Sequence, residues 1–228
     1  MRNIVIVGGS KGIGNAILIS QLNLNNKVYN ISRTAPEINH TNLTHFNCDV
    51  LNAELPEIEF VDTLIYCPGS INLKPISTLT IDDFRTDFEI NVIGAVKTIK
   101  KYLKPLKNGN NPNILLFSTV AAKLGMPYHA SVSASKSAID GLTKSLGAEL
   151  APTIRVNAIA PTVTDTVLAS KILRNDKMKE VIAEKHPLKR YLNTHDVAAL
   201  ADFLISENSS AISGQIFNLD CGIVTFKI

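Results

Sequence analysis

The chain has 228 residues, a net charge of +3, and a composition that is 45% hydrophobic and 19% charged. This length fits one domain that buries a sizeable core, and this composition excludes a disordered chain. The weak net charge, without a long basic block, gives no indication of a nucleic-acid or membrane partner.

Short sequence features at the N-terminus and at the cysteines bear on location. Only four consecutive apolar residues precede the first glycines, too few for a signal peptide or a membrane span. Cys48, Cys67 and Cys221 lack Cys-x-x-Cys spacing, so we expect reduced thiols and a cytoplasmic protein. His40 and His45 have no ligand-like neighbours in sequence, and we expect no metal site.

Apolar runs bounded by turn residues predict the strands in chain order. They cover residues 4–7, 27–31, 43–47, 61–67, 113–117, 154–159 and 215–219. The sixth of these is expected to break at Pro161, because proline cannot donate to a sheet ladder.

Helices are predicted between these strands. One covers 13–24, and a long one covers about 81–106 with a single apolar stripe that includes Phe84, Phe88 and Val92. Further helices carry Lys136, fill about 166–184, and begin at Thr194 as the N-cap. The segment from 49 to 61 is short, so we expect a turn where another helix could lie.

Strands that alternate with helices predict the fold class. The sequence indicates one α/β domain over residues 1–228, a doubly wound parallel sheet of about seven strands with helices on both faces. Ligands bind such sheets beyond the carboxyl ends of the strands.

A glycine-rich loop follows the first strand and opens the first predicted helix. Gly8, Gly12 and Gly14 allow a tight turn, close approach of the backbone to a pyrophosphate, and close packing of helix on strand. The start of the helix offers free N–H groups to an anion. The loop therefore predicts a dinucleotide site.

The end of the second strand indicates which dinucleotide is bound. An acidic residue there binds the ribose 2′-hydroxyl, whereas a basic one accommodates a 2′-phosphate. Arg33 occupies this region, and Lys11 lies in the glycine loop. We therefore expect NADP(H) in preference to NAD(H).

The stretch from Ser118 to Lys136 is typical of a catalytic site. Ser118 and Thr119 end a buried strand, and Lys136 lies on the following helix. Val132 is one turn before Lys136, on the same face of the helix. An apolar side chain in this position is unexpected.

These motifs resemble those of the short-chain dehydrogenase/reductase family over essentially the whole chain. The family's Thr-Gly-x-x-x-Gly-x-Gly loop aligns with residues 7–14, with valine at 7, and its Arg-Val-Asn-x-x-x-Pro-Gly segment aligns with 155–162. Asn91 matches the active-site asparagine, Thr119 the catalytic serine, and Lys136 the lysine that holds the nicotinamide ribose.

The resemblance implies a Rossmann fold, a small-molecule substrate, and a homotetramer or homodimer formed through the long helices. It also implies cofactor contacts, in which Asp49-Val50 binds adenine and Thr166 binds the nicotinamide carboxamide. The residues expected to contact the cofactor are Gly8, Ser10, Lys11, Gly12, Ile13, Gly14, Arg33, Asp49, Val50, Pro68, Gly69, Lys136, Pro161, Thr164 and Thr166.

Two further departures from the family lie near the expected active site. Residues 66–69 read Tyr-Cys-Pro-Gly where the family has Asn-Asn-Ala-Gly, and Val132 replaces the tyrosine of Tyr-x-x-x-Lys. By resemblance, that tyrosine protonates the carbonyl oxygen as hydride arrives. Valine cannot exchange a proton, but Lys136 can still hold the ribose.

Three interpretations of Val132 follow. In the first, Tyr128 or His129 donates the proton, beside Thr119, Lys136 and Asn91 as the other catalytic residues. In the second, Thr119, Lys136 and water support slow carbonyl chemistry. Both predict an oxidoreductase that transfers hydride to or from a carbonyl or conjugated enoyl substrate. In the third, the protein is a catalytically silent nucleotide-binding sensor or subunit.

Overall fold

A parallel sheet organises the computed structural model, which describes residues 1–226. Within these residues its strand order is β3-β2-β1-β4-β5-β6-β7, and every neighbouring pair is parallel. The strands are β1 (Asn3–Val7), β2 (Lys27–Ser32), β3 (Leu43–Asn47), β4 (Thr63–Tyr66), β5 (Asn113–Phe117), β6 (Arg155–Pro161) and β7 (Ile216–Leu219).

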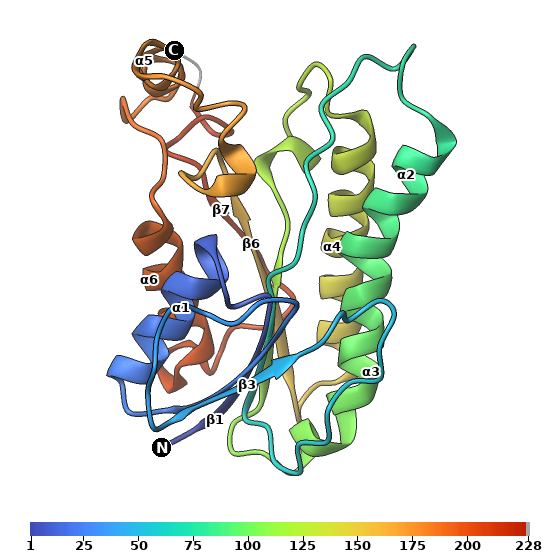
Figure 1. Cartoon of the computed structure of the whole chain (residues 1–228), viewed down its shortest axis with the longest axis vertical. Helices are drawn as coiled ribbons and strands as arrows, with labels where there is room; N and C mark the ends of the chain where they lie inside the picture. The colour runs from blue at the N-terminus through green and yellow to red at the C-terminus, as the bar shows by residue number, and fades with distance from the viewer. Residues whose placement is uncertain (227–228) are drawn as a thin grey trace.

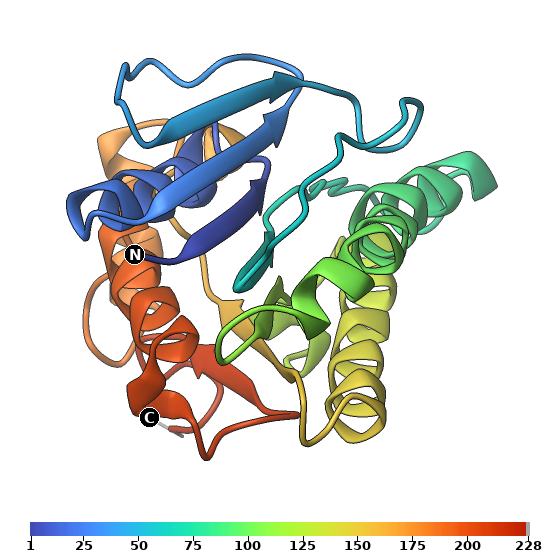
Figure 2. The same cartoon turned by 90° about the horizontal axis from the view of Figure 1, so that it is seen from below.

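Helices cover both faces of the sheet, as Figures 1 and 2 show. α1 and α6 pack together on one face, whereas α2, α3 and α4 lie on the other. The helices are α1 (Gly12–Asn23), α2 (Ile81–Phe88), α3 (Gly94–Lys107), α4 (Ala130–Glu149), α5 (Asp176–Glu184) and α6 (Thr194–Ile205).

The core has two halves because neighbouring residues of β1 point to opposite faces. Val5 and Val7 join the apolar cluster under α3 and α4, while Ile4 and Ile6 join the one under α1 and α6. All four side chains are at most 1% exposed. A strand that is buried on both faces reads as a continuous apolar run, as this one does. The predicted doubly wound α/β fold is confirmed.

β6 does not break at Pro161, contrary to the prediction. Pro161 pairs with Leu219 of β7, and the Thr162 N–H donates to the Leu219 carbonyl at 2.9 Å. Because alternate residues of a strand face opposite neighbours, the nitrogen of Pro161 faces the side of β5. That strand has already ended at Phe117, so no ladder hydrogen bond is lost.

α6 begins one residue away from its predicted cap. The N-cap is Asn193, whose side chain accepts a hydrogen bond from the Asp196 N–H at 3.0 Å. The Asp196 carboxylate accepts in return from the Asn193 N–H at 2.9 Å. This reciprocal pair favours Asn193 over Thr194, which is the first residue of the helix.

The predicted long helix is continuous but contains a π-helical turn over Glu89–Ile93, between α2 and α3. A π turn adds one residue to the helix, so the inward-facing positions before it are offset by one. Asp87 is therefore buried at 1% exposure, whereas Phe88 is 43% exposed. The predicted stripe is wrong at Phe88 for this reason.

The predictions for two connecting segments have different outcomes. The segment 50–60 contains turns and no helix, as predicted from its length. The predicted helical region 166–184 is only partly helical: a short 3-10 turn covers Val167–Ala169, and α5 covers Asp176–Glu184. Asn175 caps α5 by accepting from the Met178 N–H, which places the start of that helix.

Candidate functional site

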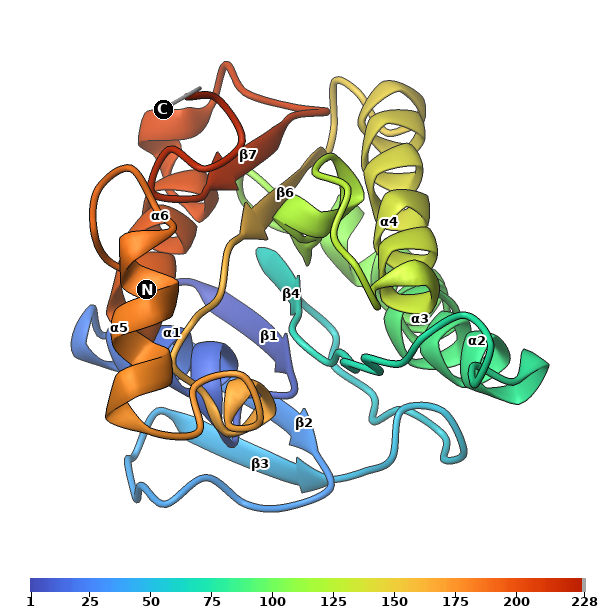
Figure 3. The same cartoon turned by 90° about the horizontal axis from the view of Figure 1, so that it is seen from above.

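The predicted site residues gather at one edge of the sheet. Because all the strands are parallel, their carboxyl ends lie at this edge, toward which Figure 3 looks. Gly8 follows β1, Arg33 follows β2, Cys67 follows β4, Ser118 follows β5 and Thr162 follows β6. A ligand at this edge would contact several loops at once.

The glycine loop has the conformation that an anion site requires. Gly8 and Gly12 have φ angles of +80° and +56°, which favour glycine. A Cβ at Gly14 would lie 2.3 Å from the carbonyl oxygen of Gly8, so only glycine allows α1 to start this close to β1. No side chain caps the first turn of α1. Its N–H groups fit a pyrophosphate.

Hydroxyl and basic groups lie beside this loop. The Thr34 hydroxyl donates to Ser10 Oγ at 3.3 Å, which joins the loop after β2 to the glycine loop. Lys11 and Arg33 are exposed in these two loops, and neither forms an ion pair within residues 1–226. This region fits a phosphate group.

Asp49 and Val50 follow β3. The Asp49 carboxylate accepts from the Leu51 N–H and from the Asn52 side chain, each at 3.0 Å. The Leu51 N–H is the main cause that lowers the Asp49 pKa below its usual value. Val50 is 9% exposed. An ionised carboxylate fixed in this way can accept a hydrogen bond from a donor group on a nucleotide base.

One cavity connects the glycine-loop side of this edge to the predicted catalytic residues. Ile13, Gly69, Pro161, Thr164 and Thr166 line it, all of them predicted cofactor contacts. Thr119, Lys136 and His129 line the same cavity, as does Val132. A mainly apolar wall of Ile71, Val120, Met126, Leu168 and Ile172 completes it.

Lys136 is buried at the wall of this cavity. It is 8% exposed, and its Nζ donates to the Phe117 carbonyl at 2.8 Å. Burial lowers its pKa to about 8, against the opposing effects of Cys67 and Asp87. Burial likewise raises the pKa of the Cys67 thiol to about 12. Lys136 is thus a buried cation held where a ribose hydroxyl could reach it.

Asn91 lies in the π-helical turn and faces Lys136 across Gly69. A Cβ at Gly69 would lie 3.3 Å from Asn91 Oδ1 and 3.5 Å from Lys136 Nζ. The Asn91 amide donates to Ser135 Oγ at 3.2 Å, whereas its Oδ1 has no partner among the described residues. A buried acceptor of this kind is suited to a ligand donor.

Thr119 and Ser118 present two hydroxyls at the end of β5. Thr119 Oγ1 accepts from the Ala121 N–H at 3.3 Å and lines the cavity. Ser118 Oγ donates to the Lys136 carbonyl at 3.3 Å. The Thr119 O–H is therefore free to donate into the cavity, the role expected of the family serine.

The two predicted proton donors are placed differently. His129 lines the cavity, and its Nδ1 lies 2.7 Å from the Pro127 carbonyl oxygen. A carbonyl can only accept, so Nδ1 carries the proton and Nε2 is left for other contacts. Tyr128 is 59% exposed, has a φ of +69°, and is not among the residues that line the cavity.

Sequence reasoning did not single out Ser70 and Asp87. Ser70 lines the cavity and donates to the buried Asp87 carboxylate at 2.5 Å. Asp87 precedes Asn91 by four residues on the same helix, a spacing that places both side chains on one face. The four-residue spacing to Asn91 is the sequence signal that could have identified Asp87. The π-helical turn, which the sequence pattern does not reveal, makes Asp87 rather than Phe88 the inward-facing residue.

Within residues 1–226, no group of three or more His, Cys, Asp or Glu side chains is arranged to hold a metal ion. In that part of the chain, no helix has the length and apolar character needed to cross a membrane.

Comparison with known proteins agrees with this geometry. A family model described as Enoyl-(Acyl carrier protein) reductase matches residues 21–224. A tropinone reductase homolog of Arabidopsis thaliana is 28% identical over 244 residues, which cover 97% of this chain and 91% of that protein.

Two solved structures have the same fold. The ligand-free aldohexose dehydrogenase of Thermoplasma acidophilum superposes with a TM-score of 0.90 at 24% identity, over 99% of this chain and 95% of that one. A Tyr-to-Phe variant of ElxO with NADPH bound superposes with a TM-score of 0.88 at 25% identity, over 99% and 100% of the two chains. The chain belongs to the short-chain dehydrogenase/reductase family.

Proposed function

We propose that the protein is an NADP(H)-dependent oxidoreductase that transfers hydride to or from a carbonyl or conjugated enoyl substrate. The observation that carries the proposal is that Lys136 and Thr119 line one cavity adjoining the glycine loop, with Asn91 close behind Gly69 of its wall. When bound, the cofactor supplies or accepts the hydride. Lys136 would hold its ribose, the first turn of α1 its pyrophosphate, and Thr119 would polarise the substrate oxygen.

The cavity wall supports an apolar substrate with one polar group. Val120, Met126, Leu168 and Ile172 face the cavity beside Thr119. Such a wall contributes burial energy of roughly 25 cal/mol per Å² of apolar surface and leaves the hydroxyl to orient the reacting oxygen. The family model and the tropinone reductase homolog are named for an enoyl and a carbonyl reduction, which favours these two substrate classes.

Cofactor binding and turnover are tested separately. NADPH and NADH are titrated by fluorescence, and oxidation of NADPH is then followed with panels of ketones and enoyl thioesters. Binding with turnover supports the proposal. Absence of binding to either cofactor contradicts it. Binding without any turnover would instead favour the silent sensor or subunit, to which the relatives' names give no support.

Arg33→Ala tests the preference for NADP(H). We expect the Kd for NADPH to rise at least about tenfold, or about 1.4 kcal/mol, because one charge near the 2′-phosphate is lost. The Kd for NADH should change less than about twofold. Lys100→Ala, at an exposed position on α3, is the matched control. An equal effect of Arg33→Ala on both cofactors would contradict the assignment.

His129→Gln tests the predicted proton donor that lines the cavity. If His129 is the acid, we expect kcat to fall at least about tenfold, because a positioned acid contributes about 10²–10⁴-fold. Tyr128→Phe, at the neighbouring exposed position, tests the other predicted donor, and a loss of at least about tenfold there would assign the proton to Tyr128 instead. A His129→Gln enzyme with kcat within about twofold of the wild type removes His129 from the mechanism.

The homotetramer or homodimer expected from the resemblance is also part of the proposal. Phe88 and Ile93 are 43% and 39% exposed on the long helix, where such a contact would form. Sedimentation equilibrium of the purified chain measures the state directly.

A further inference from the structure

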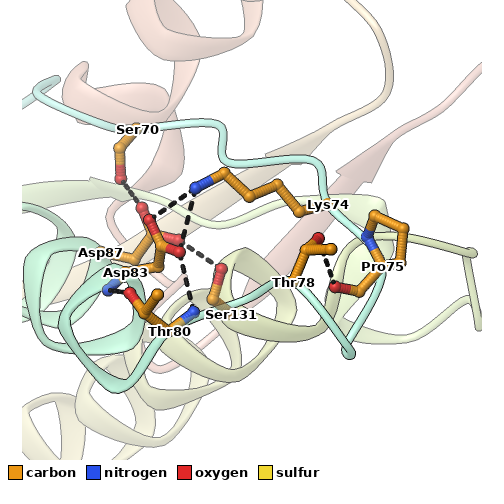
Figure 4. Close-up of polar contacts among 8 residues, drawn as sticks. All are labelled: Ser70, Lys74, Pro75, Thr78, Thr80, Asp83, Asp87 and Ser131. Carbon is orange, nitrogen blue, oxygen red and sulfur yellow. Dashed lines mark hydrogen bonds and ion pairs between the residues drawn. The ribbon is translucent and has the colours of Figure 1, made fainter.

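Asp87 is a buried carboxylate beside the cavity. It is 1% exposed, and it forms no ion pair with any residue in the range 1–226. Its two oxygens accept from two hydroxyls: Oδ1 from Ser70 at 2.5 Å and Oδ2 from Ser131 at 2.6 Å. Figure 4 shows both contacts. Burying a charge without a cation in direct contact is costly, so a carboxylate here needs an explanation.

Only one of the two hydroxyls leads to the cavity. Ser70 lines it, whereas Ser131 is 1% exposed and is not among the lining residues. Ser70 Oγ also accepts from the Asn91 amide at 3.0 Å. A serine oxygen has two lone pairs and one proton, so Ser70 keeps one lone pair for a group in the cavity.

The charges around Asp87 come from three segments. Lys136 of α4 is the buried cation nearby and attracts the carboxylate. Asp83, one turn earlier on α2, is paired with Lys74 of the preceding loop at 3.0 Å. Cys67, after β4, stays protonated because burial raises its pKa to about 12. Asp87 is thus the carboxylate on this wall that is not held by a surface lysine.

We propose that Ser70 and Asp87 form a proton relay. The relay transfers the proton that Val132, which has no hydroxyl, cannot transfer. The inference rests on the proposed function, because it concerns the proton that accompanies the hydride. Ser70 would touch the reacting oxygen and act as the catalytic residue. Asp87 acts through Ser70, because its carboxylate holds the proton that Ser70 passes to it.

The relay balances in both directions. As an alcohol carbon gives up its hydride, the alcohol O–H bond breaks and its proton bonds to Ser70 Oγ. The proton of Ser70 passes to Asp87 Oδ1, and the electron pair of the broken O–H bond forms the carbonyl π bond. In reduction the same transfers run backwards, from Asp87 through Ser70 to the carbonyl oxygen.

Variants of Ser70, Asp87 and Ser131 test the relay with a substrate that the wild-type enzyme turns over. Ser70→Ala and Asp87→Asn should each lower kcat at least about tenfold, and the double variant should be no slower than either, because the two residues act as a unit. Ser131→Ala is the matched control: it removes the other hydrogen bond to Asp87 and should leave kcat within about twofold. Ser70→Thr, which keeps a hydroxyl, should retain most of the rate.

Two kinetic results would overturn the relay. One is a Ser70→Ala enzyme with kcat within about twofold of the wild type. The other is an equal loss in Ser70→Ala and Ser131→Ala, which would make Asp87 a structural anchor only. Melting temperature and NADPH affinity of each variant identify a loss that comes from misfolding.

A measurement without turnover tests the same path. Trifluoroethanol, an unreactive alcohol, is added to protein labelled with ¹³C at the aspartate carboxyls, and the Asp87 resonance is assigned by its loss in Asp87→Asn. The resonance should shift in the wild type and in Ser131→Ala but not in Ser70→Ala. No shift in the wild type contradicts the relay even where NADPH binding and turnover are intact.

Discussion

Replacing Val132 with tyrosine is expected to raise carbonyl reduction by about 10²–10⁴-fold when the relay is disabled by Ser70→Ala, because a positioned acid contributes about that much. Val132 is 4% exposed, lines the cavity and precedes Lys136 by one helical turn. A phenol at this position would enter the cavity beside the buried ammonium, which stabilises the phenolate. In the wild-type background, where another donor acts, the gain should be smaller, about tenfold.

Val132→Phe is the matched control for this result. It fills the same space without a hydroxyl, so the ratio of the two variants isolates the proton from the volume of the ring. The measurement is kcat/KM for a ketone that the wild type reduces. Equal rates for the tyrosine and phenylalanine variants would mean that the substrate oxygen does not lie near position 132.

Lys136→Met should stabilise the fold while it removes function. The pKa of Lys136 is lowered from 10.5 to about 8, and each unit corresponds to 1.36 kcal/mol, so its burial costs about 3 kcal/mol at pH 7. Methionine removes this cost but also the hydrogen bond to Phe117. We expect the melting temperature to rise by about 5 °C and the Kd for NADPH to rise at least about tenfold.

The pH dependence of this stabilisation has a definite sign. In the window between about 8 and 10.5 the unfolded chain binds more protons at this lysine than the folded one, so wild-type stability rises with pH there. The advantage of Lys136→Met should therefore be greatest below about pH 8 and shrink toward pH 10.5. Thermal melts across this range measure it, with Lys144→Met on the exposed side of α4 as the control. A variant less stable than the wild type at pH 7 would contradict the burial cost.

Most of the fold could be predicted from periodicity and turn residues. The run at Ile4 to Val7 indicated a strand covered on both faces, and the structure buries it in both halves of the core. The break predicted at Pro161 is wrong because the effect of a missing N–H depends on the side of the strand it faces. The nitrogen of Pro161 faces the side of β5, which has already ended, so no hydrogen bond is lost. Asn193 was missed because two adjacent residues could cap α6, and only the partner at Asp196 distinguishes them.

The candidate site was less predictable than the fold. The glycine loop and Lys136 carry patterns that are local in sequence, and the structure brings both to one edge of the sheet. The contact between Ser70 and Asp87 joins residues 17 apart through side chains, and no local pattern encodes it. Asp87 is further hidden because a regular apolar stripe through Val92 assigns the inward position to Phe88, its neighbour.

The π-helical turn over Glu89–Ile93 also sets how this helix tolerates changes in length. Deleting one residue within it leaves a regular α-helix whose two flanks keep their orientation, since the turn holds one residue more than an α-helix needs. Inserting one residue into α2 or α3 has no such compensation and rotates one flank by about 100° relative to the other. The helix can therefore shorten by one residue without changing how its flanks face, whereas one added residue rotates one flank away from the contacts it makes.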